Sequence, residues 1–279
     1  MITNTIPSQS ITSQVKRALE EDVGQQDVTA DLIPADAQAT AIIITRENAV
    51  LCGQSWCDEV FKQLDPTITI EWNMDDGDSV QANDVLCTLH GPARTLLTGE
   101  RTAMNFIQTL SATATLVRDY TEQVKDLAVD ILDTRKTIPT LRLAQKYAVR
   151  CGGGVNHRVG LYDGILIKEN HINAAGSIAD AVRQAHHLHP TIAIEVEVEN
   201  FDELEQALNT QADIILLDNF DIASLKKAVA INQGRAKLEA SGGITFDKVR
   251  AIATTGVDRI SIGTLTKDIK AIDLSMRFI

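Results

Sequence analysis

The alternation of short apolar runs with helical patterns in the C-terminal half constrains the fold more than any other feature. Six such runs occur: Val129–Leu132, Ile165–Ile167, Ile192–Val198, Ile214–Leu217, Lys237–Ala240 and Arg259–Ile262. The helical patterns between them are Ile178–His187, Phe201–Leu208, Ala223–Ile231 and Phe246–Thr254. This alternation is typical of a parallel sheet covered by helices. About six right-handed units in succession favour a smaller or incomplete relative of the common α/β barrel.

Polar or glycine residues end or follow every one of these runs. In chain order they are Thr134, Arg135 and Lys136; Lys168, Glu169 and Asn170; Glu195 and Glu197; Asp218 and Asn219; Ser241, Gly242 and Gly243; and Gly263 and Thr264. Functional side chains of α/β barrels lie at the C-terminal ends of the strands. The sequence therefore predicts a functional site at that edge of the sheet.

A block of basic residues lies between Ile131 and His171, in a protein whose formal net charge is -12. Its members are Arg135, Lys136, Arg142, Lys146, Arg150, His157, Arg158 and Lys168. A local positive cluster in an acidic chain indicates a pocket for small anionic substrates. General binding to nucleic acid is not expected, because a phosphate backbone needs a net basic surface.

Composition also bears on the compartment. The cysteines, Cys52, Cys57, Cys87 and Cys151, form no CxxC pair, which favours free thiols over a disulfide framework or a zinc site. The N-terminal MITNTIPSQS lacks the features of a signal peptide, and no apolar run approaches the roughly 20 residues that span a bilayer. We expect a soluble, cytoplasmic protein without a membrane partner.

The N-terminal part predicts a small α/β sandwich. We expect helices over Ser13–Glu21 and Ser55–Leu64 and strands over Ala39–Ile44, Asn48–Cys52 and Thr67–Trp72. The turn DGDSV resembles turns of lipoyl-like carrier domains, but no lysine stands where a carrier would be attached, which favours a structural role.

A longer helical pattern, Leu96–Asp119, comes after the sandwich, with Gly99 as its one interruption. It contains Arg101 beside Glu100. From these two residues alone, an ion pair at the surface is the simplest interpretation.

Three glutamates alternate with apolar residues in the third run. Glu195, Glu197 and Glu199 share one face of the strand. Ile194, Val196 and Val198 share the other, which should meet the helices. Buried glutamates are costly unless they are paired with cations or a metal, so the basic block supplies candidate partners. We expect Glu199, nearest the end of the strand, to be solvated.

Two glycine-containing loops, Ser241-Gly242-Gly243 and Ser261-Ile262-Gly263, begin at the C-terminal ends of the last two predicted strands. Glycine lets the backbone approach a ligand, and N–H groups at the start of a helix favour phosphate. The last two loops of α/β barrels often bind phosphate. These loops are therefore candidate phosphate sites.

Several motifs, in one order, resemble the quinolinate phosphoribosyltransferases, also called nicotinate-nucleotide pyrophosphorylases (carboxylating). They are EDVGQQDVTADLIP, GERTAMNFIQTLSATAT, DTRKTIPTLRLAQKYAVRCGGGVNHRVGLYDGILIKENHI, EVEVEN, LLDN, ASGGI and GVDRISIG. The resemblance covers nearly the full length. It implies an α/β fold of the type II phosphoribosyltransferase kind, with an N-terminal α/β sandwich and an incomplete, six-unit α/β barrel.

The resemblance also implies a reaction. Quinolinate and 5-phosphoribosyl 1-diphosphate would give nicotinate mononucleotide, diphosphate and carbon dioxide, a step of NAD biosynthesis, with Mg²⁺ and no organic cofactor. By motif, the quinolinate-binding positions are Arg101, Thr134, Arg135, Lys136, His157 and Arg158. Those near ribose, diphosphate and magnesium are Lys168, Glu197 and Asp218, and the phosphate loops contain Ser241, Gly242, Gly243, Ser261, Ile262 and Gly263. The residues expected to be catalytic are Lys136, Lys168, Glu197 and Asp218, and Glu197 and Asp218 would also hold the metal, directly or through water.

The family further implies a homodimer or larger homo-oligomer, because the position of Arg101 is reached from a neighbouring subunit. Expected domain limits are 1–106 for the sandwich and 107–267 for the barrel, with residues 268–279 packing on the N-terminal domain. Ile138 and Thr140 stand where the family commonly has threonine and glycine, and Asn83 stands where it commonly has glycine. We expect altered loop packing there and unchanged chemistry.

Alternatives remain on this evidence. Lys168, at a strand end, could form a Schiff base in an aldolase-type lyase. Such an enzyme needs little else that is cationic, so it leaves the arginines and both glycine loops unexplained. A paralogous phosphoribosyltransferase with another substrate is a further possibility. A protein that only binds a ligand would give the acidic side chains at the strand ends little purpose.

Overall fold

The computed structural model describes residues 6–279, which form two compact units. Unit 1 contains the residues up to 118 together with 137–153 and 265–279, and unit 2 contains 119–136 and 154–264. Two later segments thus return to the N-terminal unit. The two units are therefore not continuous stretches of the chain like the expected domains 1–106, 107–267 and 268–279, and those domain limits stay a prediction.

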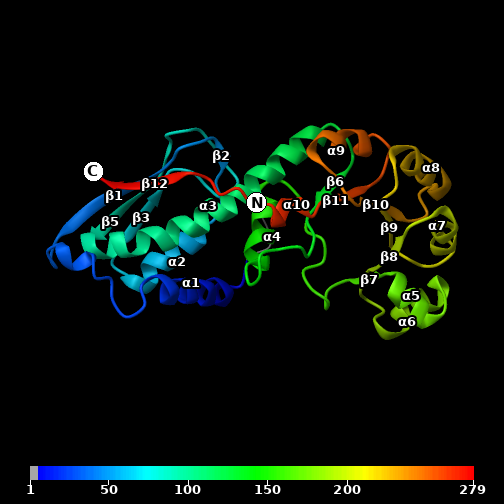
Figure 1. The fold of residues 1–279 in the computed structure, drawn as a ribbon, viewed down its shortest axis with the longest axis horizontal. Helices are drawn as coiled ribbons and strands as arrows, with labels where there is room; N and C mark the ends of the chain where they lie inside the picture. Colours follow the sequence, from blue (N-terminus) through cyan, green and yellow to red (C-terminus); the bar gives the residue numbers. More distant parts are fainter. Residues whose placement is uncertain (1–5) are drawn as a thin grey trace. The chain divides into compact units, whose positions relative to one another are not determined.

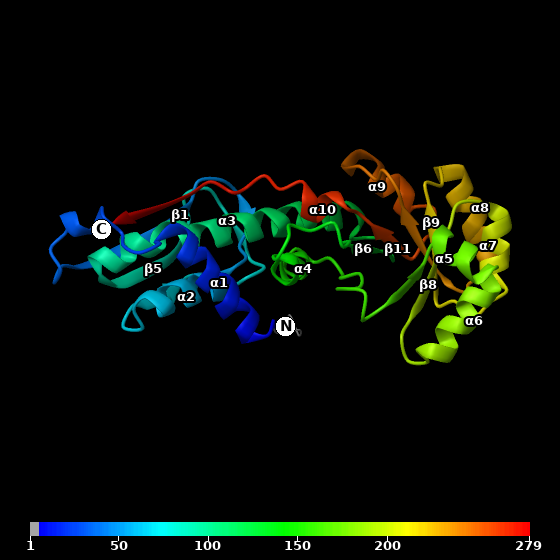
Figure 2. The same ribbon diagram turned by 60° about the horizontal axis from the view of Figure 1, so that its bottom comes forward.

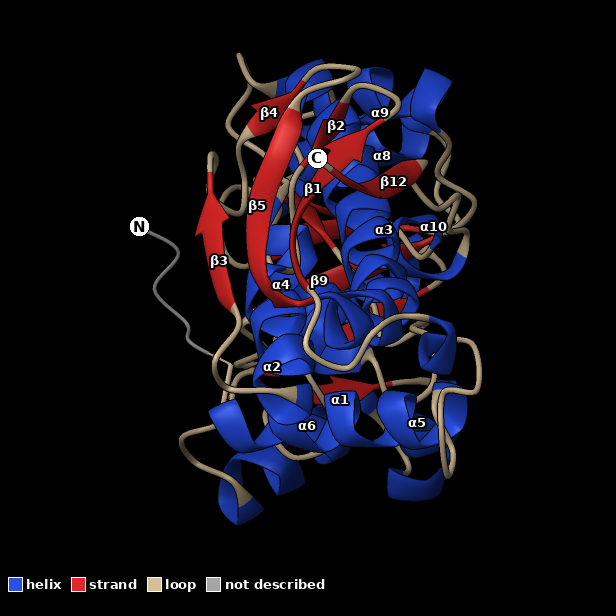
Figure 3. Cartoon of the chain, turned by 90° about the vertical axis from the view of Figure 1, so that its left-hand side faces the viewer, coloured by secondary structure: helices blue, strands red, loops and turns tan. Residues whose placement is uncertain are grey.

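Unit 1 is built on an antiparallel sheet with the strand order β12-β1-β5-β3. Figures 1 and 3 show the C-terminal strand β12 beside β1. In the register of that pair, Ala41 lies opposite Phe278 and Thr45 lies opposite Leu274. The strands are β1 (Gln38–Thr45), β3 (Thr69–Trp72), β5 (Val85–Pro92) and β12 (Leu274–Phe278), with a separate pair of β2 (Ala49–Val50) and β4 (Ser79–Val80).

The helices of unit 1 include a pair that packs closely because of one glycine. They are α1 (Ser8–Asp22), the short 3-10 turn η1 (Ala30–Leu32), α2 (Gln54–Leu64), most of α3 (Ala93–Val124), α4 (Arg142–Cys151) and most of α10 (Thr264–Lys267). A Cβ atom on Gly99 of α3 would lie 2.6 Å from the ring of Phe61 on α2. Gly99 therefore permits the contact, and it does not interrupt the helix.

Unit 2 contains a parallel six-stranded sheet with the order β6-β11-β10-β9-β8-β7. Its strands are β6 (Asp130–Leu132), β7 (Ile165–Ile167), β8 (Ile194–Val198), β9 (Ile214–Asp218), β10 (Lys237–Ser241) and β11 (Arg259–Ser261). All six predicted runs are confirmed as strands. The sheet has two edges, β6 and β7, so this is the incomplete barrel that the sequence predicted.

Helices cover one face of this sheet, as Figure 2 shows for α6 to α9. They are α5 (Glu169–Ala175), α6 (Ile178–Leu188), α7 (Phe201–Leu208), α8 (Ile222–Asn232) and α9 (Phe246–Ala253). Ile194, Val196 and Val198 are fully buried, as expected of side chains that meet helices. We call the opposite face of the sheet the inner face.

The strand register assigns side chains to the inner face. Glu197 is paired with Leu216, which is paired with Glu239, which is paired with Arg259. Paired residues point to the same face of a sheet. The inner face therefore carries charged side chains from three strands. Glu199 is exposed, as expected.

Two of the departures from the family pattern fall at positive φ. Asn83 has φ 75° and Thr140 has φ 68°, in the left-handed region that favours glycine. The carbonyl of Thr140 accepts a hydrogen bond from Gln14 Nε2 at 2.8 Å. The positive φ at both positions thus explains why glycine is common there in the family.

All four cysteines are free and buried, as predicted. Cys52 and Cys151 lie near the half-buried carboxylate of Asp76. That carboxylate accepts hydrogen bonds from the N–H groups of Gly53 and Gln54 and from the hydroxyl of Tyr147. With its oxygens used in this way, Asp76 is a structural cap for α2.

Candidate active site

Lys168 and Glu197 form an ion pair at the C-terminal ends of the adjacent strands β7 and β8. Lys168 Nζ contacts Glu197 Oε2, and the two side chains are 46% and 17% exposed. The N–H of Lys168 donates to His171 Nδ1 at 3.0 Å, which fixes the start of α5. The ammonium group therefore borders solvent while its carboxylate partner is largely covered.

The turn after β9 packs directly on the first glycine loop. Asn219 Nδ2 donates to Asp218 Oδ2 at 2.7 Å, and the N–H of Asn219 donates to the carbonyl of Ser241 at 3.0 Å. A Cβ atom on Gly242, whose φ is +98°, would lie 2.1 Å from Asn219 Oδ1. Only glycine fits at position 242, whereas a Cβ atom on Gly243 would meet nothing within 4 Å.

The loops after β6 and β11 also meet, as their strands are neighbours. A Cβ atom on Gly263 would lie 3.0 Å from Lys136 Cδ and 3.7 Å from Thr134 Oγ1. The hydroxyl oxygen of Thr134 accepts the N–H of Lys136 at 3.0 Å. Ser261 and Ile262, from the second glycine loop, are buried. Lys136 therefore lies over the second glycine loop.

Arg135 and Arg158 are held within electrostatic range of each other. Burial lowers the pKa of Arg158, and the charge of Arg135 lowers it further. Arg158 Nη1 donates to the carbonyl of Gly164 at 3.2 Å, while Asp163 accepts the N–H groups of Val159 and Gly160 at 2.8 Å each. Two guanidinium groups that repel each other are favourably placed to share an anion.

His157 lies against two buried glutamates on the inner face. Its Nε2 atom is 2.8 Å from Glu195 Oε2 and 3.5 Å from Glu239 Oε1. Arg259 Nε lies 3.4 Å from Glu239 Oε2. Burial lowers the pKa of His157, but the hydrogen bond to Glu195 and the charges of both glutamates outweigh it, so the pKa is raised. Burial, with the charge of Glu195, raises the pKa of Glu239 to about 7.

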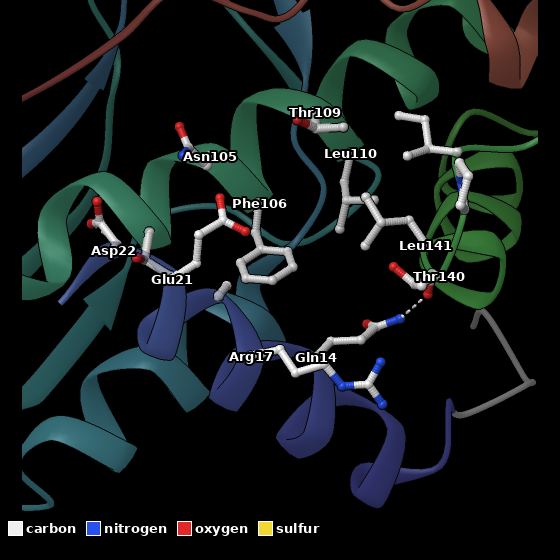
Figure 4. Close-up of a pocket in the computed structure, with 14 residues that line it drawn as sticks. Gln14, Arg17, Glu21, Asp22, Asn105, Phe106, Thr109, Leu110, Thr140 and Leu141 are labelled. Carbon is white, nitrogen blue, oxygen red and sulfur yellow. Dashed lines mark hydrogen bonds between the residues drawn. The ribbon is translucent and has the colours of Figure 1, made fainter. Parts of the chain in front are cut away.

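Arg101 lies in unit 1, on α3, and its side chain is exposed. A pocket of about 460 Å³ occurs within that unit, between α1, α3 and residues 138–141 (Figure 4). Arg17, Glu21 and Asp22 line it together with apolar side chains such as Phe106, and its lining includes no predicted site residue.

The residues of the basic block are divided between the two units. Arg142, Lys146 and Arg150 lie on α4 in unit 1, where Lys146 is buried and the guanidinium of Arg150 lies over the ring of Tyr147. The block members in unit 2 are Arg135, Lys136, His157, Arg158 and Lys168. The interpretation of the eight residues as one anion site stays a prediction.

Sequence reasoning missed Glu239 and Arg259. Both belong to short runs that were interpreted only as strands: Glu239 lies inside its run, and Arg259 is the first residue of its run. The period of two, which singled out Glu195 and Glu197, would have placed Glu239 on one face with Ser241. That signal could have assigned Glu239 to the inner face.

Among residues 6–279, none of the helices combines the length and the apolar character needed to cross a bilayer.

Comparison with known proteins is consistent along the whole chain. The family model for the N-terminal domain of quinolinate phosphoribosyl transferase matches residues 27–111, and the model for its C-terminal domain matches residues 113–277. A probable nicotinate-nucleotide pyrophosphorylase [carboxylating] of Bacillus subtilis is 41% identical, over 94% of this chain and 93% of its own length.

Solved structures are similar as well. The nicotinate-nucleotide pyrophosphorylase of Francisella tularensis has a TM-score of 0.97 and 50% identity, covering 99% of this chain and 98% of its own. NadC from Streptococcus pyogenes has a TM-score of 0.95 and 36% identity, covering 99% and 100%. With both domain models matched and similar relatives aligned from end to end, the chain belongs to the quinolinate phosphoribosyltransferase family.

Proposed function

We propose that this protein carries out its family's decarboxylating phosphoribosyl transfer to quinolinate with the side chains at the C-terminal edge of the unit 2 sheet. The observation that carries this proposal is the placement, at one edge, of a Lys168–Glu197 ion pair, Asp218 and two neighbouring guanidinium groups. The products are nicotinate mononucleotide, diphosphate and carbon dioxide.

Quinolinate has two adjacent carboxylates, which suits Arg135 and Arg158. Planar guanidinium groups bind carboxylates through paired hydrogen bonds, and two such groups held together lose their mutual repulsion when an anion binds. Lys136, with Thr134 beside it, adds a further positive charge to this pocket, and His157 accepts the backbone N–H of Arg158. Loss of one buried guanidinium should cost about 2–5 kcal/mol of binding.

The phosphoribosyl donor occupies the other half of the site. Its 5-phosphate lies at the glycine loops Ser241-Gly242-Gly243 and Ser261-Ile262-Gly263. The hydroxyl of the following Thr264 is buried and has no hydrogen-bond partner within residues 6–279, which leaves a donor available for a phosphate oxygen. Lys168 lies beside the diphosphate.

Glu197 and Asp218 fit a magnesium ion by their chemistry. Both are oxygen donors from adjacent strands, and Mg²⁺ in phosphoryl-compound sites is usually held by one or two carboxylates together with substrate oxygens and water. When bound, the ion would neutralise charge on the leaving diphosphate. Glu197 already accepts from Lys168, so a contact through water suits it as well as a direct one.

The chemistry then depends on the charges that this chain supplies. Departure of diphosphate leaves a positively charged ribosyl centre, which the carboxylate of Glu197 or Asp218 stabilises. The pyridine nitrogen of quinolinate attacks that centre, held in line by the arginines. The ring nitrogen becomes positive and stabilises the electron pair that stays on C2 when the bond to the C2 carboxylate breaks and carbon dioxide leaves. A proton from water then adds to C2, so no organic cofactor is needed.

The active unit is a homodimer or a larger homo-oligomer with shared sites. Arg101 is exposed on α3, and we assign it to the quinolinate pocket of a neighbouring subunit, as the family resemblance implies. Variants Arg101→Ala and Arg135→Ala should each be impaired. Mixing them under subunit exchange should restore about a quarter of the wild-type activity, because about half of the dimers are then mixed and each has one intact site. No recovery on demonstrated exchange would contradict shared sites.

The experiment that tests the activity monitors nicotinate mononucleotide and carbon dioxide from quinolinate, 5-phosphoribosyl 1-diphosphate and magnesium, in a buffer that mimics the cytoplasm. Nicotinate replaces quinolinate in a parallel reaction, and borohydride trapping with carbonyl compounds tests Lys168 as a Schiff-base lysine. Formation of product with quinolinate but not with nicotinate supports the proposal. A trapped adduct at Lys168 without product would favour the lyase, although an ammonium group paired with Glu197 is a poor nucleophile. Product from neither acid and no adduct would favour a paralogous transferase.

A further inference from the structure

A buried cluster of four ionisable side chains lies on the inner face of the unit 2 sheet. Glu195 comes from β8, Glu239 from β10 and Arg259 from β11, while His157 comes from the segment between α4 and β7. The side chains of Glu195, Glu239, His157 and Arg259 are 5%, 0%, 10% and 15% exposed. We call these four residues the inner-face cluster.

Such a cluster is not the arrangement that maximises stability. The interior of a complete α/β barrel is filled by layers of bulky apolar side chains. Removing two carboxylates from water is costly, and apolar residues of similar volume are often at least as stabilising as a buried ion pair. The inner-face cluster therefore suggests a use in the site above it.

The hydrogen bonds of His157 indicate that use. The N–H of Arg158 donates to His157 Nδ1 at 2.8 Å, so Nδ1 is an acceptor and the ring proton lies on Nε2. Nε2–H then donates to Glu195. Both ring nitrogens are thus used within the protein, and the ring is fixed in one tautomer and one orientation.

Asp133 binds the backbone next to His157. The N–H of His157 donates to Asp133 Oδ1 at 2.8 Å, and Asn156 Nδ2 donates to Asp133 Oδ2 at 2.8 Å. Asp133 is buried directly after β6. The two successive peptides that end at the N–H groups of His157 and Arg158 are therefore fixed, the first by Asp133 and the second by the imidazole ring.

We propose that Glu195, Glu239 and Arg259 are positioning residues that orient His157 so that its Nδ1 atom fixes the backbone of Arg158 for substrate binding. Glu195 accepts the hydrogen bond from the ring. Glu239, whose negative charge Arg259 neutralises in part, lies beside the same ring nitrogen. His157 then acts through Arg158 rather than by a nitrogen contact with the substrate. This inference rests on the proposed role of Arg158 in binding a dicarboxylate.

A metal ion bound by His157, Glu195 and Glu239 is a competing explanation of the same cluster, because their ligand atoms lie within 4.8 Å of one another. The hydrogen bonds argue against it. A ring whose Nε2 carries a proton and whose Nδ1 accepts from Arg158 has no lone pair left for a metal. The guanidinium of Arg259 beside Glu239 also supplies the positive charge that a metal would bring.

The test compares Glu195→Gln with Glu195→Leu in the full-length protein, with KM measured separately for both substrates. The glutamine carbonyl can accept from Nε2–H, whereas leucine cannot. We expect the leucine variant to raise KM for quinolinate about 10- to 100-fold with a much smaller change for 5-phosphoribosyl 1-diphosphate, and the glutamine variant to restore most of the loss. Asp213→Asn is the matched control, because Asp213 accepts the N–H of Ile194 at the opposite end of β8 and should leave both constants unchanged.

A second readout is the ¹⁵N NMR signature of the His157 ring, assigned by the signal that disappears in His157→Gln. At a pH above the raised pKa of this imidazole, the wild-type ring should be the Nε2–H tautomer, retained in Glu195→Gln and lost in Glu195→Leu. An unchanged KM for quinolinate in a folded Glu195→Leu variant would overturn the proposal, as would a loss confined to kcat. A stoichiometric metal that is lost in Glu239→Gln would also overturn it. If the wild-type protein formed no product, the proposed function would fail. The NMR signature of the His157 ring in the Glu195 variants would still test whether the inner-face cluster orients this ring.

Discussion

Replacing Gly242 with alanine places a methyl group where the turn after β9 already fills the space. The added Cβ atom would lie 2.1 Å from Asn219 Oδ1, 2.7 Å from Asn219 Cγ and 2.9 Å from the backbone nitrogen of Asn219. The amide side chain could rotate away, but the backbone nitrogen cannot, because its N–H donates to Ser241. The glycine loop must therefore move away from Asp218-Asn219.

The free-energy cost of Gly242→Ala has two parts. Alanine at φ +98° costs about 1–3 kcal/mol in backbone strain. Overpacking against a fixed neighbour costs about 1–3 kcal/mol more. If the loop retreats to relieve both, a loss of about 2–6 kcal/mol in transition-state stabilisation corresponds to about a 30-fold to more than ten thousand-fold lower kcat/KM for 5-phosphoribosyl 1-diphosphate.

Gly243→Ala provides the matched control. Gly243 has φ +57°, which alanine can adopt for about 1–2 kcal/mol, and a Cβ atom there would meet nothing within 4 Å. Steady-state kinetics with the phosphoribosyl donor varied should therefore give a much smaller loss for this variant. An equal or smaller loss for Gly242→Ala, in a protein with a wild-type circular dichroism spectrum, would refute the packing argument.

Three further outcomes are expected. Asp76→Asn removes a carboxyl group whose pKa burial raises to about 6 from 3.8, so the folded parent keeps a proton that the unfolded chain releases. The stability of the variant relative to the parent should then rise by about 3 kcal/mol as the pH increases through this window. Urea unfolding followed by tryptophan fluorescence measures it, because Trp56 and Trp72 both lie in unit 1, and a pH-independent difference would contradict the reasoning. Lys168→Met and Glu197→Gln should each lower kcat/KM for the phosphoribosyl donor about 10- to 100-fold, with the double variant losing less than the sum of both free-energy losses, since the two side chains are paired. Strict additivity would argue against a functional pair. Ser177→Ala should destabilise unit 2 by about 1 kcal/mol, because Ser177 Oγ accepts the N–H of Asp180 at the start of α6. Thermal unfolding checks this, and Ser177→Asp should restore the cap.

The sheet of unit 2 could be predicted because its strands are short apolar runs separated by amphipathic helices, a pattern that depends on local periodicity. Lys168 and Asp218 were predicted for the same reason, since they end two such runs. Those strands are neighbours of β8, which carries Glu197, so the sheet order brings the three side chains to one edge.

Other features depend on contacts between distant parts of the chain, which periodicity does not encode. One such feature is the return of α4 to unit 1, which assigns Arg142, Lys146 and Arg150 to a different unit from the rest of the basic block. The pairing of Glu239 with Arg259 likewise needed the strand register, and that of Glu195 with His157 needed the path of the segment between α4 and β7. Periodicity assigns a residue to one face of its strand but does not identify its partner across the sheet.

The position of β12 has a consequence for synthesis of the protein on the ribosome. The strand β12 lies far along the chain from β1, so one edge of β1 stays unpaired until Leu274–Phe278 has been synthesised. An open strand edge on a nascent chain can pair with another chain and start aggregation. Stalled or truncated products that end before Leu274 should therefore be the most aggregation-prone forms of this protein, and chaperones that shield nascent chains should matter most for unit 1.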